Sequence, residues 1–142
     1  MIKAKKKNET VYYRGFDEQG NESRGCPAFT EKGTFIIDKS LCIPVKIDRN
    51  TLCSWTGKND CNGNPVFEGD IVRYKYEDRV TGEDKYEDYL VQWDREKAGF
   101  CMSTPLTYYE ETLYRTPGFE VVGNVYKNPE LAKQFDGVRR GI

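Results

Sequence analysis

The chain has 142 residues, of which 32% are charged and 37% hydrophobic, and its 22 cationic and 23 acidic side chains leave a formal charge of −1. This length suits one domain that buries about two-thirds of the surface of its unfolded chain. The composition excludes a disordered chain and a strongly basic surface. The sequence therefore predicts a single globular domain over residues 11–136, between a basic flexible leader at residues 1–10 and a flexible tail at residues 137–142.

Cellular location is indicated by the apolar pattern and by the cysteines. No stretch approaches the roughly twenty apolar residues that cross a bilayer, and the leader lysines, Lys3, Lys5, Lys6 and Lys7, are not followed by the apolar region of a secretory signal. The five cysteines are dispersed, without a Cys-x-x-Cys pair, which is typical of free thiols in a reducing compartment. We therefore expect a cytoplasmic protein.

The chain contains no histidine. This excludes Ser-His and Cys-His hydrolase sites and the Cys₂His₂ zinc pattern, and dispersed cysteines lack the close pairs of a four-cysteine zinc site. We therefore assign no catalytic residue, no cofactor and no metal ligand, and expect a protein that is not an enzyme.

Turn residues recur about every ten positions, and the intervals are rich in Val, Ile, Tyr and Phe, a pattern typical of a mostly β chain. Strands are predicted at residues 11–16 and 34–37, the first closed by a turn at residues 17–21. Apolar residues alternate through residues 41–47, which predicts a strand with one face on the core. Because Pro44 lacks an N–H donor, this strand is expected at a sheet edge or at a bulge.

Two clusters of oxygen-bearing side chains follow: Asp60, Asn62 and Asn64 form the first, and Glu68 and Asp70 form the second. The first has the spacing that opens an EF-hand calcium loop, but Pro65 and Ile71 stand where that loop needs glycine and glutamate. The second is a candidate acid-base pair, but a Gly-Asp step that enters a strand commonly forms a tight turn. We interpret both clusters as turns in which Asx side chains accept from backbone amides.

The strongest local prediction is a hairpin over residues 69–93. The segment Lys75-Tyr76-Glu77-Asp78 recurs as Lys85-Tyr86-Glu87-Asp88, and a loop of residues 80–82 with a left-handed Gly82 joins the two strands. The predicted register pairs Tyr76 with Tyr86, Glu77 with Lys85, Lys75 with Glu87, Arg79 with Glu83, Asp78 with Asp84, Val72 with Leu90 and Ile71 with Val91. The base of this hairpin is apolar and its tip is charged.

The C-terminal part begins with an open assignment. Residues 106–115 place apolar side chains at helical spacing but are rich in strand-favouring Thr and Tyr, so strand and helix both remain open. Further on, Asn128 is a suitable N-cap, Pro129 suits the first helical position, and Glu130 lies in the first turn. One short helix is predicted from Pro129 to about Phe135.

Residues 47–73 read IDRNTLCSWTGKNDCNGNPVFEGDIVR. This segment resembles the core signature of the YopX family of phage and prophage proteins, with its aspartate-turn-threonine entry, aromatic-Thr-Gly, Asn-Gly turn and Glu-Gly-Asp-Ile-Val. Similar blocks at residues 91–94, 99–100 and 119–131 extend the resemblance over residues 41–131. Departures at Lys58, Cys61 and Pro65 leave the geometry of the turn open. No activity is established for that family, so the resemblance implies a phage or prophage origin and a bacterial host cell, but no reaction.

We expect a small, mostly β domain, built as a strongly bent sheet or a partly open SH3-like barrel, with a projecting hairpin and one short C-terminal helix. The candidate partner-binding residues, all in the hairpin, are Tyr76, Tyr86, Tyr89, Arg79 and Glu83. The expected role is a non-enzymatic accessory protein that binds a host or phage protein, or a second copy in a homo-oligomer. The alternative is a nucleic-acid-binding small β-barrel module that uses the leader lysines and aromatic rings, although the hairpin carboxylates repel phosphate. The sequence identifies neither the partner nor the stage of the phage cycle.

Overall fold

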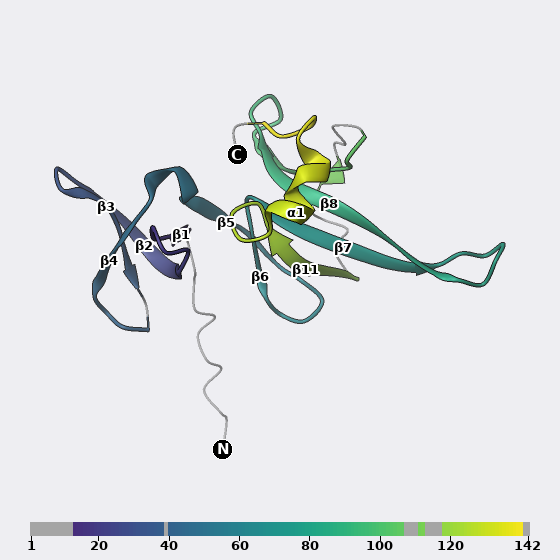
Figure 1. Cartoon of the computed structure of the whole chain (residues 1–142), viewed down its shortest axis with the longest axis horizontal. Helices are drawn as coiled ribbons and strands as arrows, with labels where there is room; N and C mark the ends of the chain where they lie inside the picture. Colours follow the sequence, from purple (N-terminus) through teal and green to yellow (C-terminus); the bar gives the residue numbers. More distant parts are fainter. Residues whose placement is uncertain (1–12, 39, 107–110, 113–117, 141–142) are drawn as a thin grey trace, which may run out of the picture. The chain divides into compact units, whose positions relative to one another are not determined.

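The chain folds as two compact units, one within residues 1–54 and one within residues 55–142. A computed structural model describes residues 13–38, 40–106, 111–112 and 118–140 (Figure 1). The sequence predicted one domain over residues 11–136, whereas the structure has this division. The predicted basic leader at residues 1–10 lies outside the described residues.

Unit 1 is an antiparallel sheet of β1 (Tyr13–Phe16), β2 (Glu22–Thr30), β3 (Gly33–Asp38) and β4 (Pro44–Ile47), in the order β4-β3-β2-β1, with the start of β5 (Cys53–Asn59) beside β1. A short 3-10 helix, η1 (Arg49–Thr51), precedes β5. Phe16, Ile36 and Ile47 are almost fully buried in this unit. The predicted strands at residues 11–16 and 34–37 are confirmed in their described part.

The strand predicted at residues 41–47 is confirmed only from Pro44 onwards. As expected, β4 lies at the edge of its sheet. The predicted burial of Leu41 and Ile43 is wrong, since these side chains are 62% and 52% exposed. The reason is a turn: Cys42 has a φ of 55° and its N–H donates to the carbonyl oxygen of Asp38, so the alternation begins only after it.

Unit 2 contains a five-stranded antiparallel sheet in the order β10-β9-β8-β7-β11. Its strands are β7 (Asp70–Glu77), β8 (Asp84–Asp94), β9 (Gly99–Ser103), β10 (Glu111–Thr112) and β11 (Phe119–Asn124), and β6 (Pro65–Phe67) pairs with the later part of β5. The strand orders of the described residues are those of open sheets, not of a closed barrel. The mostly β class with a projecting hairpin is confirmed.

Apolar side chains of unit 2 form one cluster on each face of its sheet, since neighbouring residues of a strand point to opposite sides. One apolar cluster contains Val66, Val72, Tyr89, Val91, Met102 and Phe119. The other contains Ile71, Leu90, Val125, Ala132, Phe135 and Val138, and so includes the C-terminal helical segment. The central strands β7 and β8 therefore contribute to two apolar layers at once.

The predicted C-terminal helix is confirmed as α1 (Pro129–Ala132) followed by the 3-10 turn η3 (Lys133–Phe135). The predicted capping is wrong: the Asn128 side chain makes no cap bond and instead accepts from the N–H of Asn124 at 3.0 Å. Of residues 106–115, whose assignment the sequence left open, Glu111–Thr112 form the short strand β10 and most of the others lie outside the described residues.

The sequence predicted a flexible tail from residue 137, and in the structure this segment contacts unit 2 as far as Arg140. Val138 is 8% exposed. The buried side chain of Gln92 donates to the carbonyl oxygen of Val138 at 2.9 Å and accepts from the N–H of Arg140 at 2.6 Å.

Candidate functional site

The hairpin of β7 and β8 is longer than the strands that flank it. β11 pairs with β7 only from Asp70 to Tyr74, and β9 pairs with β8 only from Leu90 to Asp94. Residues 75–89, which we call the ribbon, therefore project as two strands and a loop, with no third described strand beside them (Figure 1). Such an element offers side chains on two faces and backbone groups on two edges.

The register of the hairpin differs by one residue from the predicted one. Tyr76 lies opposite Lys85, Lys75 lies opposite Tyr86, and Glu77 lies opposite Asp84. The predicted pairing of Tyr76 with Tyr86 is therefore wrong, and so is the predicted series of charge pairs. The left-handed Gly82 is confirmed, with a φ of 71°. The two tyrosines point to opposite faces of the ribbon, because a shift of one residue exchanges the faces.

The loop explains this register. The N–H of Asp78 donates to the carbonyl oxygen of Glu83 at 2.8 Å, and the N–H of Gly82 donates to the carbonyl oxygen of Asp78 at 2.7 Å. The Asp78 carboxylate also accepts from the N–H of Val80 at 2.8 Å. The loop therefore spans residues 79–82, one residue more than predicted, because the Asp78 side chain caps its first turn.

One face of the ribbon continues the apolar cluster as a row of aromatic rings. Tyr89 meets Phe119 edge-on at 5.5 Å between centroids, Phe119 meets Tyr74 at 5.3 Å, and Tyr74 stacks on Tyr76 at 6.1 Å. Tyr89 is only 9% exposed and its hydroxyl donates to Glu87 at 2.6 Å. Tyr89 was a predicted partner-binding residue, and the structure instead places it in the core.

The opposite face holds an exposed tyrosine on a fixed cation. The Arg73 guanidinium donates twice to the Asp88 carboxylate, at 2.7 and 3.0 Å, and lies 3.9 Å from the ring centroid of Tyr86. The bond to Asp88 raises the pKa of Arg73 above its ordinary value. The Tyr86 residue is nevertheless 58% exposed. The Arg73 guanidinium thus packs against the Tyr86 ring while the residue remains open to solvent. The predicted register did not reveal this arrangement.

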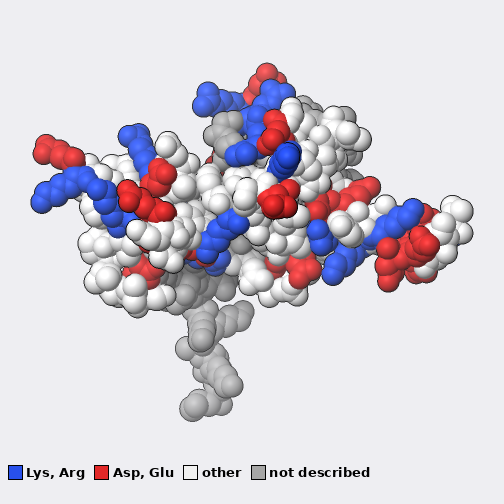
Figure 2. All heavy atoms as spheres, in the orientation of Figure 1, with Lys and Arg blue, Asp and Glu red and all other residues white. Residues whose placement is uncertain are grey.

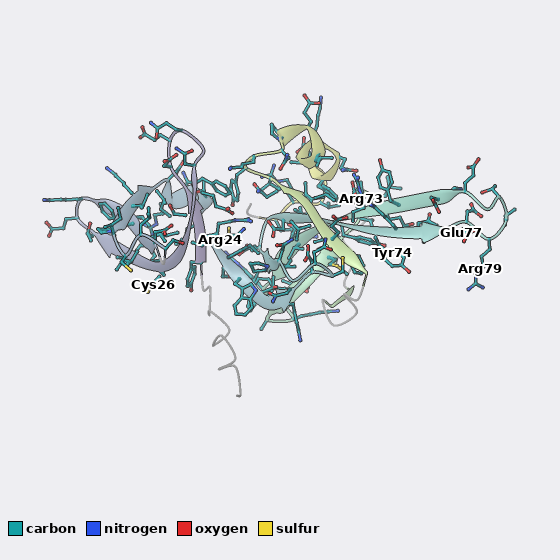
Figure 3. The ribbon with its side chains drawn as sticks, turned by 90° about the horizontal axis from the view of Figure 1, so that it is seen from below. Arg24, Cys26, Arg73, Tyr74, Glu77 and Arg79 are labelled. Carbon is teal, nitrogen blue, oxygen red and sulfur yellow. The ribbon has the colours of Figure 1, made fainter. Side chains whose placement is uncertain are left out.

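The tip of the ribbon carries the remaining predicted site residues. Arg79 and Glu83 are exposed at the loop, and Figure 3 shows Arg79 extending away from the tip. Lys85 contacts Asp78 at 2.6 Å, and this bond lowers the pKa of the Asp78 carboxyl. Figure 2 shows charges of both signs along the ribbon. The ribbon contains the cations Lys75, Arg79 and Lys85 and the carboxylates Glu77, Asp78, Glu83, Asp84, Glu87 and Asp88.

The two oxygen-rich clusters are turns, as the sequence predicted. Asp60 is 7% exposed, and its carboxylate accepts from the N–H groups of Asn62 at 2.9 Å, Asn64 at 2.8 Å and Val121 at 3.0 Å. In the second cluster, the Asp70 carboxylate accepts from the N–H of Phe67 at 2.8 Å. Both carboxylates accept hydrogen bonds from backbone N–H groups and so organise the turns around them.

Glu68, the other member of the second cluster, gives a pH-dependent prediction. Burial raises the pKa of its carboxyl, so the folded chain holds this proton more tightly than the unfolded chain. That contribution is complete below the ordinary carboxyl pKa and is lost as the pH rises through the folded-state value. Urea unfolding should therefore show Glu68→Gln gaining stability over the natural chain between acidic and neutral pH. An equal difference at both pH values would contradict this.

Unit 1 has a comparable but separate exposed ring. Phe29 is 62% exposed, and the Arg49 guanidinium lies 5.8 Å from its ring centroid. This ring borders a hollow of about 820 Å³ whose lining includes Asp48 and Lys46. The opposite side of β3 carries Phe35 and the 46% exposed Ile37. Unit 1 therefore supplies a natural control surface for experiments on the ribbon.

The family model described as YopX protein matches residues 3–133. The chain belongs to the YopX family. This confirms the resemblance drawn from residues 47–73 and extends it over nearly the whole chain. Among solved structures, the YopX-family chain is similar to protein EF1440 from Enterococcus faecalis, with 19% identity over 86% of this chain and 97% of that chain and a TM-score of 0.54. At this identity the likeness concerns the fold. No curated protein matches the chain.

Three further findings concern this YopX-family chain. Among the described residues, no group of three or more His, Cys, Asp or Glu side chains is placed to hold a metal ion. In the same part of the chain, no helix has both the length and the apolar character needed to cross a bilayer. Of the five cysteines, Cys53 and Cys101 are buried, and Cys26, Cys42 and Cys61 are exposed.

Proposed function

We propose that this YopX-family chain is a phage- or prophage-encoded accessory protein of the bacterial cytoplasm, that it binds a protein partner through the ribbon, and that it is not an enzyme. The observation that carries the proposal is the exposed Tyr86 ring held on Arg73 in a projecting element. A tyrosine whose ring is already oriented loses little conformational freedom on binding. Tyrosine and arginine are also the residue types that most often dominate the energetics of protein interfaces.

The charge of the ribbon favours a protein over a nucleic acid. Six carboxylates against three cations oppose the approach of phosphate groups. The aromatic row on the other face, from Tyr89 to Tyr76, is partly core, which leaves Tyr74 and Tyr76 as rings that contribute to a surface. The proposed binding residues are therefore Tyr76, Tyr86, Arg79 and Glu83, without Tyr89.

The test is capture from host lysate with the natural chain and with Tyr86→Ala, each with and without nuclease. We expect the affinity of Tyr86→Ala for its protein partner to be about thirtyfold lower, which is the effect of removing an interface hot spot. Phe29→Ala is the matched control, because it removes a similarly exposed ring beneath an arginine in unit 1. Retention of the partner by Tyr86→Ala and its loss in Phe29→Ala would place the interface in unit 1.

The nuclease treatment separates the alternative. Capture that disappears with nuclease would indicate nucleic acid, and fluorescence anisotropy with a labelled single strand would then locate its source. Binding that survives physiological salt and is lost on replacing Tyr76 would favour base stacking. Binding that is lost on replacing Lys3, Lys5, Lys6 and Lys7, with a log-log salt slope no steeper than about −4 on duplex DNA, would indicate the leader alone.

A further inference from the structure

The ribbon contains the tripeptide Lys-Tyr-Glu twice, and the two copies do not form Lys-Glu pairs with each other inside the hairpin. One copy is residues 75–77 and the other is residues 85–87. The observed register sets Tyr76 opposite Lys85 and Lys75 opposite Tyr86, so the lysine of one copy does not face the glutamate of the other. An antiparallel Lys-Tyr-Glu strand nevertheless complements an identical strand, because Lys then faces Glu on both sides of a Tyr pair.

One of these copies lies on a strand edge that no other described strand covers. β9 pairs with β8 from Leu90 to Asp94, and the described residues place no strand on that side of residues 84–89. Residues 84–87 are exposed. Unpaired N–H and C=O groups along such an edge are a template for another strand. On the β7 side the corresponding length is only residues 75–77, because β11 reaches Tyr74.

Charge selects one symmetric register for this edge. A two-fold axis normal to a sheet relates two antiparallel strands so that one residue lies opposite its own copy. Within the tripeptide, this central residue is residue 85, 86 or 87. Centring on Lys85 sets two lysines together, and centring on Glu87 sets two glutamates together. Centring on Tyr86 sets Lys85 opposite Glu87 of the second copy, twice.

The remaining contacts agree with a Tyr86 centre. It sets Asp84 opposite Asp88 of the second copy, but Asp88 already accepts two bonds from Arg73, which offsets the repulsion. Lys85 contacts Asp78 at 2.6 Å, and its ammonium group has further protons to donate. The two Tyr86 rings, each supported by Arg73, meet on the same face of the joined sheet.

We propose that a second copy of this chain pairs with the β8 edge in antiparallel register centred on Tyr86, so that two ribbons form one four-stranded sheet. This interaction goes beyond the proposed function, because it requires no other protein. Its strand contact is short, so the expected dimer is weak, with dissociation in the micromolar range. Purified protein tests it alone, and its failure leaves binding of a heterologous partner untouched.

The experiment uses charge reversal and sedimentation velocity on the full chain at tens of micromolar. The natural chain should sediment as a species of twice 16.5 kDa. Lys85→Glu and Glu87→Lys should each weaken the dimer about tenfold or more, because each sets like charges opposite one another at two positions. An equimolar mixture of the two variants should recover it as a heterodimer, and the double variant should recover a homodimer.

The other copy of the tripeptide supplies the control. Lys75→Glu and Glu77→Lys make the same charge changes on β7 and should leave the dimer unchanged. Circular dichroism of each variant verifies that it folds. A monomeric natural chain would overturn the proposal. The assignment to β8 would be overturned if the variants at residues 75 and 77 weakened the dimer and their mixture recovered it, while the variants at residues 85 and 87 had no effect.

Discussion

Gly25→Ala is expected to unfold unit 1, with a loss of about 3 kcal/mol or more, the upper range for overpacking a tightly fitted position. Gly25 lies in β2, between Tyr13 of β1 and Asp38 of β3. A Cβ at this position would stand 2.0 Å from the carbonyl oxygen of Ile37 and 3.0 Å from its carbonyl carbon. Backbone in a sheet does not move aside as a side-chain end does, so β3 must separate from β2.

Hydrogen exchange followed by mass spectrometry provides the measurement, since it reports on the units separately. Peptides from β1 to β4 should lose protection in Gly25→Ala, while those from β8 and β9 should keep it. Gly20→Ala is the control: this glycine has a φ of 82° in a turn, and nothing lies within 4 Å of the added Cβ. It should lose only about 1 kcal/mol, from the left-handed backbone. Similar protection in both variants would contradict the packing argument.

Gly25 also explains why β2 escaped prediction. Glycine and proline inside a strand usually signal a break, and β2 contains both Gly25 and Pro27. In the structure Gly25 is the residue that lets β3 approach, which is a requirement of tertiary packing that no local pattern expresses. By contrast, the turns at Asp60 and Asp70 were predictable, because an Asx side chain accepts from amides only a few residues away.

The hairpin shows where charge patterns mislead. Cross-strand ion pairs each contribute about 0.2–1 kcal/mol, so three of them do not outweigh a change in which apolar residues are buried. Leu90 shares a cluster with Ile71, and Val91 shares the other cluster with Val72. The observed register keeps Leu90 opposite Ile71, whereas the predicted one moves it to the face of Val72. Burial on two faces therefore fixed the register.

The docked C-terminus was missed for a related reason. Residues 137–140 have no periodic pattern, and the signal lay elsewhere, in Gln92 among the apolar residues of β8. A fully buried amide needs partners for its donors and acceptor. In the structure it donates to Ser103 at 2.9 Å and makes its other bonds to Val138 and Arg140. A glutamine among apolar residues thus indicates that its amide needs hydrogen-bond partners, but it does not identify the segment that supplies them.

Ending the chain at Gly137 is therefore expected to destabilise unit 2 by about 3 kcal/mol, from the lost burial of Val138 and two lost hydrogen bonds of Gln92. In thermal unfolding this corresponds to a decrease on the order of 10 °C. A chain that ends at Arg140 is the control, because it keeps both contacts, and its stability should equal that of the full chain.

A second variant separates the amide from the apolar contact. Gln92→Leu removes the group that the shortened chain leaves unsatisfied, so in the chain ending at Gly137 it should recover part of the lost stability. In the full chain the same substitution should destabilise, because it orphans the carbonyl of Val138 and the N–H of Arg140. Opposite signs in the two backgrounds would demonstrate that the Gln92 amide and the C-terminal segment act as one unit. If Gln92→Leu lowers the stability equally in both backgrounds, and ending the chain at Gly137 has no effect, then the C-terminal segment does not contact unit 2, as its sequence alone suggested.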